Sequence, residues 1–177
     1  VGDKTITKLN TQQMAIKIMM NSLYGALGNR WFRYYDVRVA EAITLSGQLA
    51  IRWAEKAVND YMNKILGSSN HDYVIAIDTD SVYINFGPMV DQMGLTDKAQ
   101  IVKVIDEIVA KKFEPLLKDS YDDMAQYMDA YENKMVMERE VIADVGIWTA
   151  KKRYILNVHN SEGVQYAKPK LKIMGIE

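Results

Sequence analysis

Residues 73–86 read Tyr-Val-Ile-Ala-Ile-Asp-Thr-Asp-Ser-Val-Tyr-Ile-Asn-Phe, two apolar runs separated by Asp-Thr-Asp-Ser. β-Branched and aromatic residues favour strands, whereas Asp, Thr and Ser favour turns. The stretch therefore predicts a β-hairpin with Asp78 and Asp80 at its tip.

The two carboxylates at this tip are a candidate metal site. Residues two apart on a strand share a face and lie about 6–7 Å apart along the chain. Acids at that spacing repel each other unless a proton or a cation neutralises them, and carboxylate oxygens suit Mg²⁺ and Mn²⁺. An ordinary turn explains the same composition without any function. An EF-hand calcium loop is excluded, because Tyr83 and Met89 stand where that loop needs Gly and Glu.

The composition is that of a globular domain: 177 residues, 49% hydrophobic and 25% charged. The absence of cysteine excludes disulfides, thiolate zinc sites and cysteine nucleophiles, and two histidines disfavour a histidine metal cluster. No apolar stretch reaches the ~18–20 residues of a membrane span and no signal peptide is present, so we expect a cytoplasmic protein without a membrane partner. The net charge of −1 requires any nucleic-acid attraction to come from local basic clusters.

Two helices are predicted before the hairpin. Thr11 is the expected N-cap of a helix over residues 12–27, and a second helix is expected over residues 39–66. A short aromatic connector joins them, which favours an antiparallel helix pair.

After the hairpin, we expect a loop over residues 87–94, and then a helix capped by Thr96. Pro115 should end or kink this helix, with weaker helical structure to about Tyr131. Strands are expected at residues 134–142, 151–158 and 164–167, the last two joined by a turn at residues 160–163. The predicted fold class is α+β, an antiparallel sheet with helix cover plus a protruding helix pair.

The first predicted helix carries a polar line of Lys17, Asn21 and Tyr24 at i, i+4 and i+7, which spans about 10 Å of one face. Gly25 follows, although a mid-helix glycine costs ~1 kcal/mol relative to alanine. Such a glycine indicates that something approaches the backbone closely. These side chains suit phosphate, base and sugar groups, but a solvated helix face explains the same spacing.

Charged residues also mark the predicted sheet. On a strand, Lys152 and Tyr154 of the sequence Lys-Lys-Arg-Tyr would share a face, which suits a nucleic-acid backbone; a charged edge strand is the alternative. Alternating Lys168, Lys170 and Lys172 could extend this basic track. Glu138 and Glu140 form an acidic pair on the preceding predicted strand, and charge balance across strands explains them adequately.

Three segments in this order resemble the family B DNA polymerases: Lys17-x-x-x-Asn21-Ser22-x-Tyr24-Gly25, Asp78-Thr79-Asp80-Ser81 and Lys151-Lys152-Arg153-Tyr154. The similarity is closest to the replicative polymerases of tailed bacteriophages, notably in residues 23–29 (Leu-Tyr-Gly-Ala-Leu-Gly-Asn) and 170–175 (Lys-Leu-Lys-Ile-Met-Gly). It extends over about residues 8–177.

The resemblance implies template-directed transfer of dNTPs to the primer 3′-hydroxyl of primer-template DNA, with two Mg²⁺ ions that Mn²⁺ can replace. Residues 1–66 would form the fingers helix pair and the helix returning to the palm, and residues 67–177 the palm up to the start of the thumb. Asp80 and Asp78 would hold metal, with Glu140 as a further candidate ligand, and Lys17 would assist catalysis at the triphosphate. The implied nucleotide contacts are Lys17, Asn21, Ser22, Tyr24 and Gly25, and the implied DNA contacts are Lys151, Lys152, Arg153, Tyr154 and Lys172.

The chain also departs from the family pattern. It lacks an Asp-x-x-Ser-Leu-Tyr-Pro-Ser-like segment with the upstream palm aspartate, and it lacks the exonuclease and the thumb. It carries Ala76-Ile77 where many members have Tyr-Gly. We therefore expect a fragment of a larger or split polymerase, inactive and weak in metal binding by itself, whose remaining segments lie in the same or another chain. If it is phage-encoded, it acts in the infected host's cytoplasm.

The isolated fragment is expected to expose surfaces meant for other segments, and to self-associate through them. A non-catalytic nucleic-acid-binding or assembly subunit with a polymerase-like fold is the alternative function. A metal-dependent nuclease ranks lower, because the sequence shows no convergent set of three or more acids.

Overall fold

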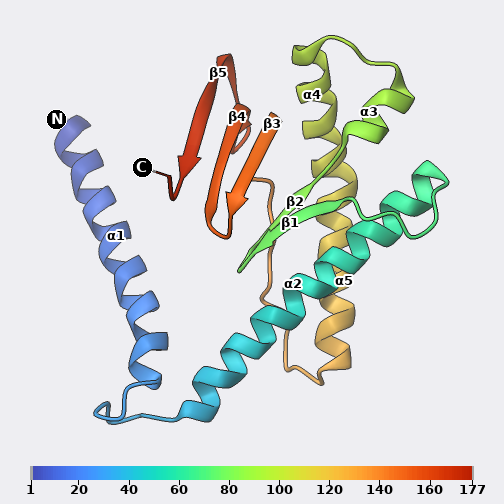
Figure 1. The fold of residues 1–177 in the computed structure, drawn as a ribbon. Coiled ribbons are helices and arrows are strands. Elements are labelled where there is room, and N and C mark those ends of the chain that lie inside the picture. The colour runs from blue at the N-terminus through green and yellow to red at the C-terminus, as the bar shows by residue number, and fades with distance from the viewer. Residues whose placement is uncertain (1, 177) are drawn as a thin grey trace. The chain divides into compact units, whose positions relative to one another are not determined.

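The computed structural model describes residues 2–176, which form two compact units divided between Gln48 and Leu49 (Figure 1). Helix α2, Val37–Leu66, continues from the first unit into the second. None of the helices in the described part of the chain is long and apolar enough to cross a membrane.

The first unit contains helix α1, Gly2–Leu27, a short loop and the start of α2. Thr11 is not the N-cap of α1, because its Oγ1 donates 2.9 Å to the carbonyl of Thr7 within the helix. The predicted end near Leu27 is confirmed. The carboxylate of Asp36 accepts the backbone N–H of Arg38 at 3.0 Å, so α2 begins two residues earlier than the predicted residue 39.

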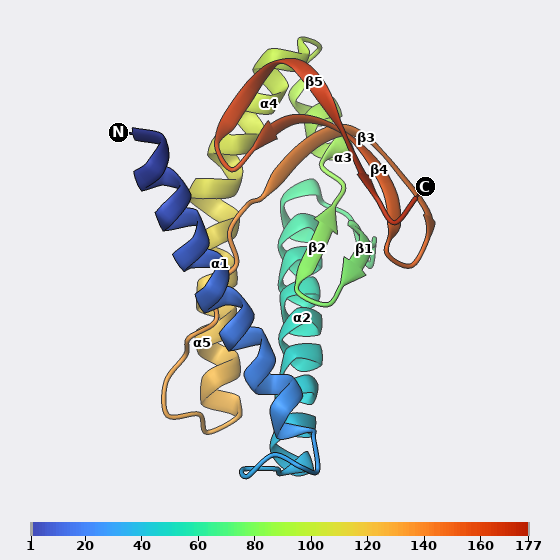
Figure 2. The same ribbon diagram turned by 90° about the vertical axis from the view of Figure 1, so that its left-hand side faces the viewer.

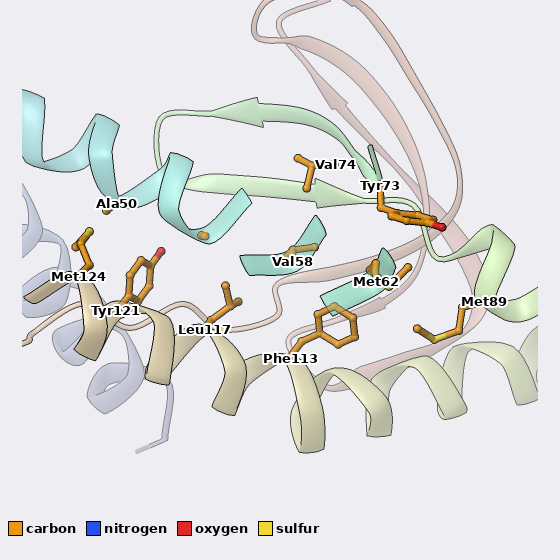
Figure 3. Packing of buried hydrophobic residues seen from close by; sticks show 11 residues of the cluster. Ala50, Val58, Met62, Tyr73, Val74, Met89, Phe113, Leu117, Tyr121 and Met124 are labelled. Atoms are coloured by element: carbon orange, nitrogen blue, oxygen red, sulfur yellow. The ribbon is translucent and has the colours of Figure 1, made fainter. Parts of the chain in front are cut away.

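The core of the second unit lies along one face of α2. Its buried residues there recur at helical spacing and are Ala50, Ile51, Ala54, Val58 and Met62. Figure 3 shows this face against Phe113, Leu117, Tyr121 and Met124 and against residues around the hairpin. Phe113 is fully buried, with Tyr61 and Phe86 edge-on at centroid distances of 5.3 and 5.1 Å. Edge-to-face pairs of this kind add stability beyond the apolar area that they bury.

The helical cover of this core differs from the prediction in detail. Helix α3, Gly87–Met93, replaces the predicted loop, with a proline in its first turn. Helix α4, Lys98–Ile108, is capped by Asp97, which accepts the N–H of Gln100 at 2.8 Å, and not by Thr96. The π-helical segment η1, Val109–Phe113, then leads into α5, Glu114–Tyr127. Pro115 does not end the helical structure as predicted: it lies in the first turn of α5, directly after the π-helical segment, and the backbone stays helical on both sides of it.

In residues 2–176, five strands form two antiparallel sheets, which confirms the α+β class. Strands β1, Val74–Asp78, and β2, Ser81–Ile84, form the predicted hairpin, which lies along α2 in Figure 2. The second sheet has the order β3-β4-β5, with bounds Val141–Ala150, Arg153–Ser161 and Val164–Met174. Glu162 and Gly163 have positive φ angles of 49° and 84°, as a two-residue hairpin turn requires, which confirms the predicted turn.

The prediction of a strand over residues 134–142 is wrong for most of its length. Residues 133–140 pair with no strand, and β3 starts at Val141. Side chains hold the segment instead: the guanidinium of Arg139 lies 2.5 Å from the carboxylate of Asp106 on α4 and donates 3.0 Å to Asn160 Oδ1 on β4. The strands of this sheet end later in the sequence than predicted; β5, for example, extends to Met174 rather than to residue 167.

Gly146→Ala is expected to lower the free energy of unfolding by about 1–3 kcal/mol, because it overpacks the sheet. A Cβ at this position would lie 2.6 Å from the Trp148 ring and 2.9 Å from Leu156. Urea unfolding followed by circular dichroism measures the change. Gly47→Ala in α2 is the matched control, since its Cβ would meet nothing within 4 Å; equal losses in the two variants would contradict the prediction.

Candidate functional site

The tip of the hairpin is a two-residue turn. Asp78 ends β1 and pairs with Ser81 at the start of β2, which leaves Thr79 and Asp80 in the turn. Thr79 has a φ of 49°, and the N–H of Asp80 donates 2.6 Å to the carbonyl of Asp78. The prediction that the two aspartates share a strand face is therefore wrong, because Asp80 belongs to the turn.

The two carboxylates differ in their surroundings. Asp78 Oδ1 accepts a 3.0 Å hydrogen bond from the hydroxyl of Thr79. Asp80 is exposed, and within residues 2–176 its carboxylate has no hydrogen-bond or ion-pair partner. Asp80 is thus the carboxylate at the tip that is free to take a cation.

The chemistry of the tip fits a hard cation, although only in part. Two carboxylates supply the oxygen ligands that Mg²⁺ prefers. Among the described residues, however, no group of three or more His, Cys, Asp or Glu side chains could hold a metal ion. A complete site at this turn would need ligands beyond Asp78 and Asp80.

Glu140, the further candidate ligand, lies just before β3 and not on the predicted strand. Its carboxylate is engaged by Lys172 of β5 at 2.6 Å, and its carbonyl accepts the N–H of Glu162 at 2.7 Å. The same ion pair occupies the ammonium of Lys172, whose side chain is 34% exposed. Lys172 is therefore less available to DNA than an unpaired surface lysine.

Lys151 and Lys152 form the turn between β3 and β4, which we call the basic turn. Their predicted place on a strand is wrong, because the chain reverses direction here and Lys152 has a φ of 62°. Gly175 supports the turn from behind: a Cβ there would lie 2.3 Å from the carbonyl oxygen of Lys152. This contact explains the glycine at the end of the sequence Lys-Leu-Lys-Ile-Met-Gly.

The cations at this end of the sheet are open to solvent. Lys151, Lys152 and Arg153 are exposed, and in the described part of the chain their charged groups have no ion-pair partner. Tyr154 follows them on β4 and is half-buried. Unpaired cations beside an aromatic ring are suited to a nucleic-acid backbone.

Three aromatic rings connect the hairpin to the sheet. Tyr83 of β2 contacts Trp148 of β3 and Tyr154 of β4 edge-on, at centroid distances of 5.2 and 5.7 Å. Burial, together with hydrogen bonding to Tyr154, raises the pKa of Tyr83 to about 12. The sequence indicates no role for Tyr83 or Trp148 in the site, since a strand pattern does not show which sheet an aromatic side chain will meet.

A groove of about 730 Å³ lies within the second unit, between the hairpin, α4 and the second sheet. Its lining includes Asp80, Tyr83, Glu140, Trp148 and Lys172. Asp80 of the carboxylate tip, the rings of Tyr83 and Trp148, and the Glu140–Lys172 pair thus line one common space.

A second polar cluster in the groove centres on Asp144, whose carboxylate lies 2.7 Å from Lys98 Nζ, 2.7 Å from Asn157 Nδ2 and 3.2 Å from His159 Nε2. Burial acts to raise the pKa of Asp144, but hydrogen bonds from Lys98, Asn157 and His159 outweigh it and lower the pKa to about 2. The folded state therefore favours the ionised carboxylate.

The lowered pKa of Asp144 predicts a loss of stability in acid. Its contribution is present above the ordinary pKa of 3.8 and disappears as the pH falls toward 2. Because the side chain is 21% exposed and screened by water, we expect a contribution of about 1–2 kcal/mol. Urea unfolding at pH 5 and pH 3 should show a smaller pH dependence for Asp144→Asn than for the parent. The exposed Asp119→Asn is the control, and equal pH dependence in both variants would contradict the prediction.

The polar line on α1 belongs to the first unit, whereas the tip and the basic turn belong to the second. Lys17, Asn21 and Tyr24 lie on one helix as predicted and are exposed. Lys17 and Asn21 have no side-chain partner in residues 2–176, whereas the hydroxyls of Tyr24 and Thr44 are 2.8 Å apart. The Ser22 hydroxyl donates 2.7 Å to the carbonyl of Ile18, so it is already used within the helix.

The space at Gly25 is open, because a Cβ there would meet nothing within 4 Å. Within residues 2–48, no protein group makes the close approach that a mid-helix glycine suggested.

The sequence profile of DNA polymerase family B matches residues 2–177. The DNA-directed DNA polymerase of Escherichia phage RB69 is 43% identical over 178 residues, which cover 94% of this chain and 20% of the relative. The DNA-directed DNA polymerase of Enterobacteria phage T4 is 42% identical over 186 residues, 99% of this chain and 21% of the relative. The DNA polymerase of Pyramimonas orientalis virus is 30% identical over 170 residues, 95% of this chain and 12% of the relative. The chain thus spans about a fifth of the length of its phage relatives.

Proposed function

The chain belongs to DNA polymerase family B, and from this premise we propose that it is the fingers-and-palm part of a DNA-directed DNA polymerase. Residues 1–66 would be the fingers helix pair with the helix returning to the palm, and residues 67–177 would be palm. The observation that carries the proposal is the presence of the polar line on α1, the carboxylate tip and the basic turn in one chain, in the order of the family's motifs.

Asp80 is the main proposed metal ligand, with Asp78 beside it. Its support is an exposed carboxylate that no protein group engages within residues 2–176. Bound Mg²⁺, for which Mn²⁺ can substitute, would supply charge stabilisation and an activated primer 3′-hydroxyl. The remaining ligands would come from polymerase segments outside this chain. Glu140 would be an outer contributor at most, because Lys172 already occupies its carboxylate.

On the fingers, the ammonium of Lys17, which has no partner within residues 2–176, would stabilise the charge that develops on the triphosphate of an incoming dNTP. Asn21 and Tyr24 would border the nascent base pair. The hydrogen bond between Tyr24 and Thr44 restrains the tyrosine side chain, and the open space at Gly25 leaves room for a base pair. The side chains that border the base pair would then select the correct dNTP by its fit.

On the palm, the basic turn with Arg153 and Tyr154 would hold the primer end. The support is local charge: the whole chain has a net charge of −1, but Lys151, Lys152 and Arg153 present unpaired cations side by side. Binding through these cations would weaken with added salt, since it releases counterions from the DNA. The partners are therefore primer-template DNA, dNTPs and the remaining polymerase segments.

A hybrid polymerase tests the proposal, namely the phage RB69 polymerase with its matching segment replaced by this chain. We expect it to extend a labelled primer on a template with dNTPs and Mg²⁺, whereas the isolated chain should not. Thermal unfolding shows whether the hybrid folds, and fluorescence anisotropy shows whether it binds primer-template. A folded hybrid that binds DNA but does not extend the primer would favour a non-catalytic nucleic-acid-binding or assembly role.

A further inference from the structure

Tyr83 lies between the two parts of the palm that carry opposite charges. It lies two residues after Ser81 on β2, so its backbone belongs to the strand that leaves the carboxylate tip. Its ring contacts Tyr154, which follows Arg153 at the start of β4 and so adjoins the basic turn. One pair of rings therefore connects the strands that leave the two turns.

Trp148 holds this contact in place on the β3-β4-β5 sheet. It pairs in register with Tyr154 on the neighbouring strand, and its ring lies over Gly146 so closely that a Cβ there would be 2.6 Å from ring atoms. The Tyr83 ring meets the Trp148 ring at 5.2 Å and 75°. A side chain packed against two rings in this way has little freedom to move without disturbing both.

Backbone pairing does not set the distance between the two turns. Strands β1 and β2 form one sheet and β3, β4 and β5 another, and within residues 2–176 no strand belongs to both. Each turn is flanked by the paired strands of its own hairpin, but the spacing between the hairpins depends on side chains. Tyr83, Trp148 and Tyr154 are the aromatic residues that meet across this junction.

We propose that Tyr83 is a positioning residue whose ring sets the distance between the carboxylate tip and the basic turn. Its importance for catalysis rests on the proposed function, because a primer end held at the basic turn must reach the carboxylates at Asp80. Misplacement of reacting groups by about 1 Å can cost on the order of 10²-fold in rate. Tyr83 would act through Tyr154 and the hairpin, without touching the substrate.

A distance measurement on the isolated chain tests the positioning directly. Since the chain has no cysteine, Thr79→Cys and Lys151→Cys introduce two unique sites for nitroxide labels, and pulsed electron paramagnetic resonance gives their distance distribution. We expect Tyr83→Phe to keep the parental distribution and Tyr83→Leu to broaden it. Tyr61→Leu is the matched control, because it removes a ring that meets Phe113 in the core but not at the junction. Its distribution should stay narrow.

An unchanged distribution in Tyr83→Leu would overturn the proposal. If Tyr83→Leu does not fold, Trp148→Leu removes the opposite side of the contact, and an unchanged distribution in that variant would overturn the proposal equally. A broadened distribution in Tyr61→Leu would also count against it, because general loosening of the core would then explain the effect.

Primer extension by the hybrid polymerase gives the catalytic readout. We expect Tyr83→Leu to lower kcat by roughly 10- to 100-fold with little change in the KM for dNTP, because the primer end is displaced and the fingers are untouched. Tyr83→Phe should retain the parental kcat. A broadened distance distribution with an unchanged kcat would overturn the catalytic role. If the parental hybrid itself does not extend the primer, the proposed function has failed, and the distance measurement still decides the positioning.

Discussion

Asp80→Asn should reduce primer extension by the hybrid polymerase by about 100-fold or more, since losses of 10- to 100-fold follow even from removing groups that only support metal ligands. The substitution keeps the size of the side chain and removes its negative charge. Asp80 lies in a two-residue turn, where it is exposed and has no partner in residues 2–176. We therefore expect the free energy of unfolding to stay nearly unchanged. Single-turnover extension at saturating dNTP measures the effect on the chemical step.

Two companion variants make this result specific. Asp119→Asn removes another exposed carboxylate, on α5, and we expect it to leave extension unchanged. Asp78→Asn should cost less than Asp80→Asn, because Asp78 already accepts a hydrogen bond from Thr79. Normal extension by Asp80→Asn would remove Asp80 from the proposed metal site. An equal loss in Asp119→Asn would show that the assay reports lost charge or folding instead.

Arg139→Met is expected to lower the free energy of unfolding of the chain by about 3 kcal/mol, the scale on which breaking a buried ion pair destabilises a protein. The Arg139 side chain is 12% exposed and lies 2.5 Å from the carboxylate of Asp106. It also donates to Asn160, which is 2% exposed. Methionine fills much of the same volume, but it leaves the carboxylate and the amide without this donor. Urea unfolding by circular dichroism measures the loss.

The matched control is Arg38→Met, which breaks an arginine–aspartate pair of similar length on the surface. Arg38 lies 2.8 Å from Asp36, but its side chain is 85% exposed and the pair is screened by water, so we expect a much smaller loss than for Arg139→Met. Similar losses in the two variants would show that the buried Arg139 ion pair stabilises the fold no more than an exposed pair does. The contrast also tests whether Arg139 holds residues 133–140 against α4.

Local sequence patterns predicted the elements whose shape depends on neighbouring residues. The hairpin around Asp78 and Asp80, most of α2 and the Glu162-Gly163 turn are confirmed, because strand alternation, helical spacing and turn chemistry act over a few residues. Two errors concern whole elements, because most of the predicted strand over residues 134–142 is unpaired and α3 replaces a predicted loop. The other errors lie at element boundaries. Thr11 lies inside α1, and Lys151 and Lys152 form a turn, since a cap or a turn depends on where the chain can find its next partner.

The candidate site divides in the same way. The resemblance to family B DNA polymerases indicated the residues of the candidate site from the sequence alone, and the family assignment is confirmed. Their roles in metal, nucleotide and DNA binding stay predictions, as does self-association of the isolated chain. The pairing of Glu140 with Lys172 could not be foreseen, because it joins a residue before β3 to one on β5.

By itself, then, the sequence determined the hairpin with its two aspartates, the helical spacing of Lys17, Asn21 and Tyr24, and membership of the family. Only the tertiary structure left the Asp80 carboxylate without a partner among residues 2–176 and joined Tyr83 to Trp148 and Tyr154. It also buried Arg139 between Asp106 and Asn160. The physical reason is range: backbone preferences and periodicity act between near neighbours, whereas these contacts join residues that meet only when separate elements pack together.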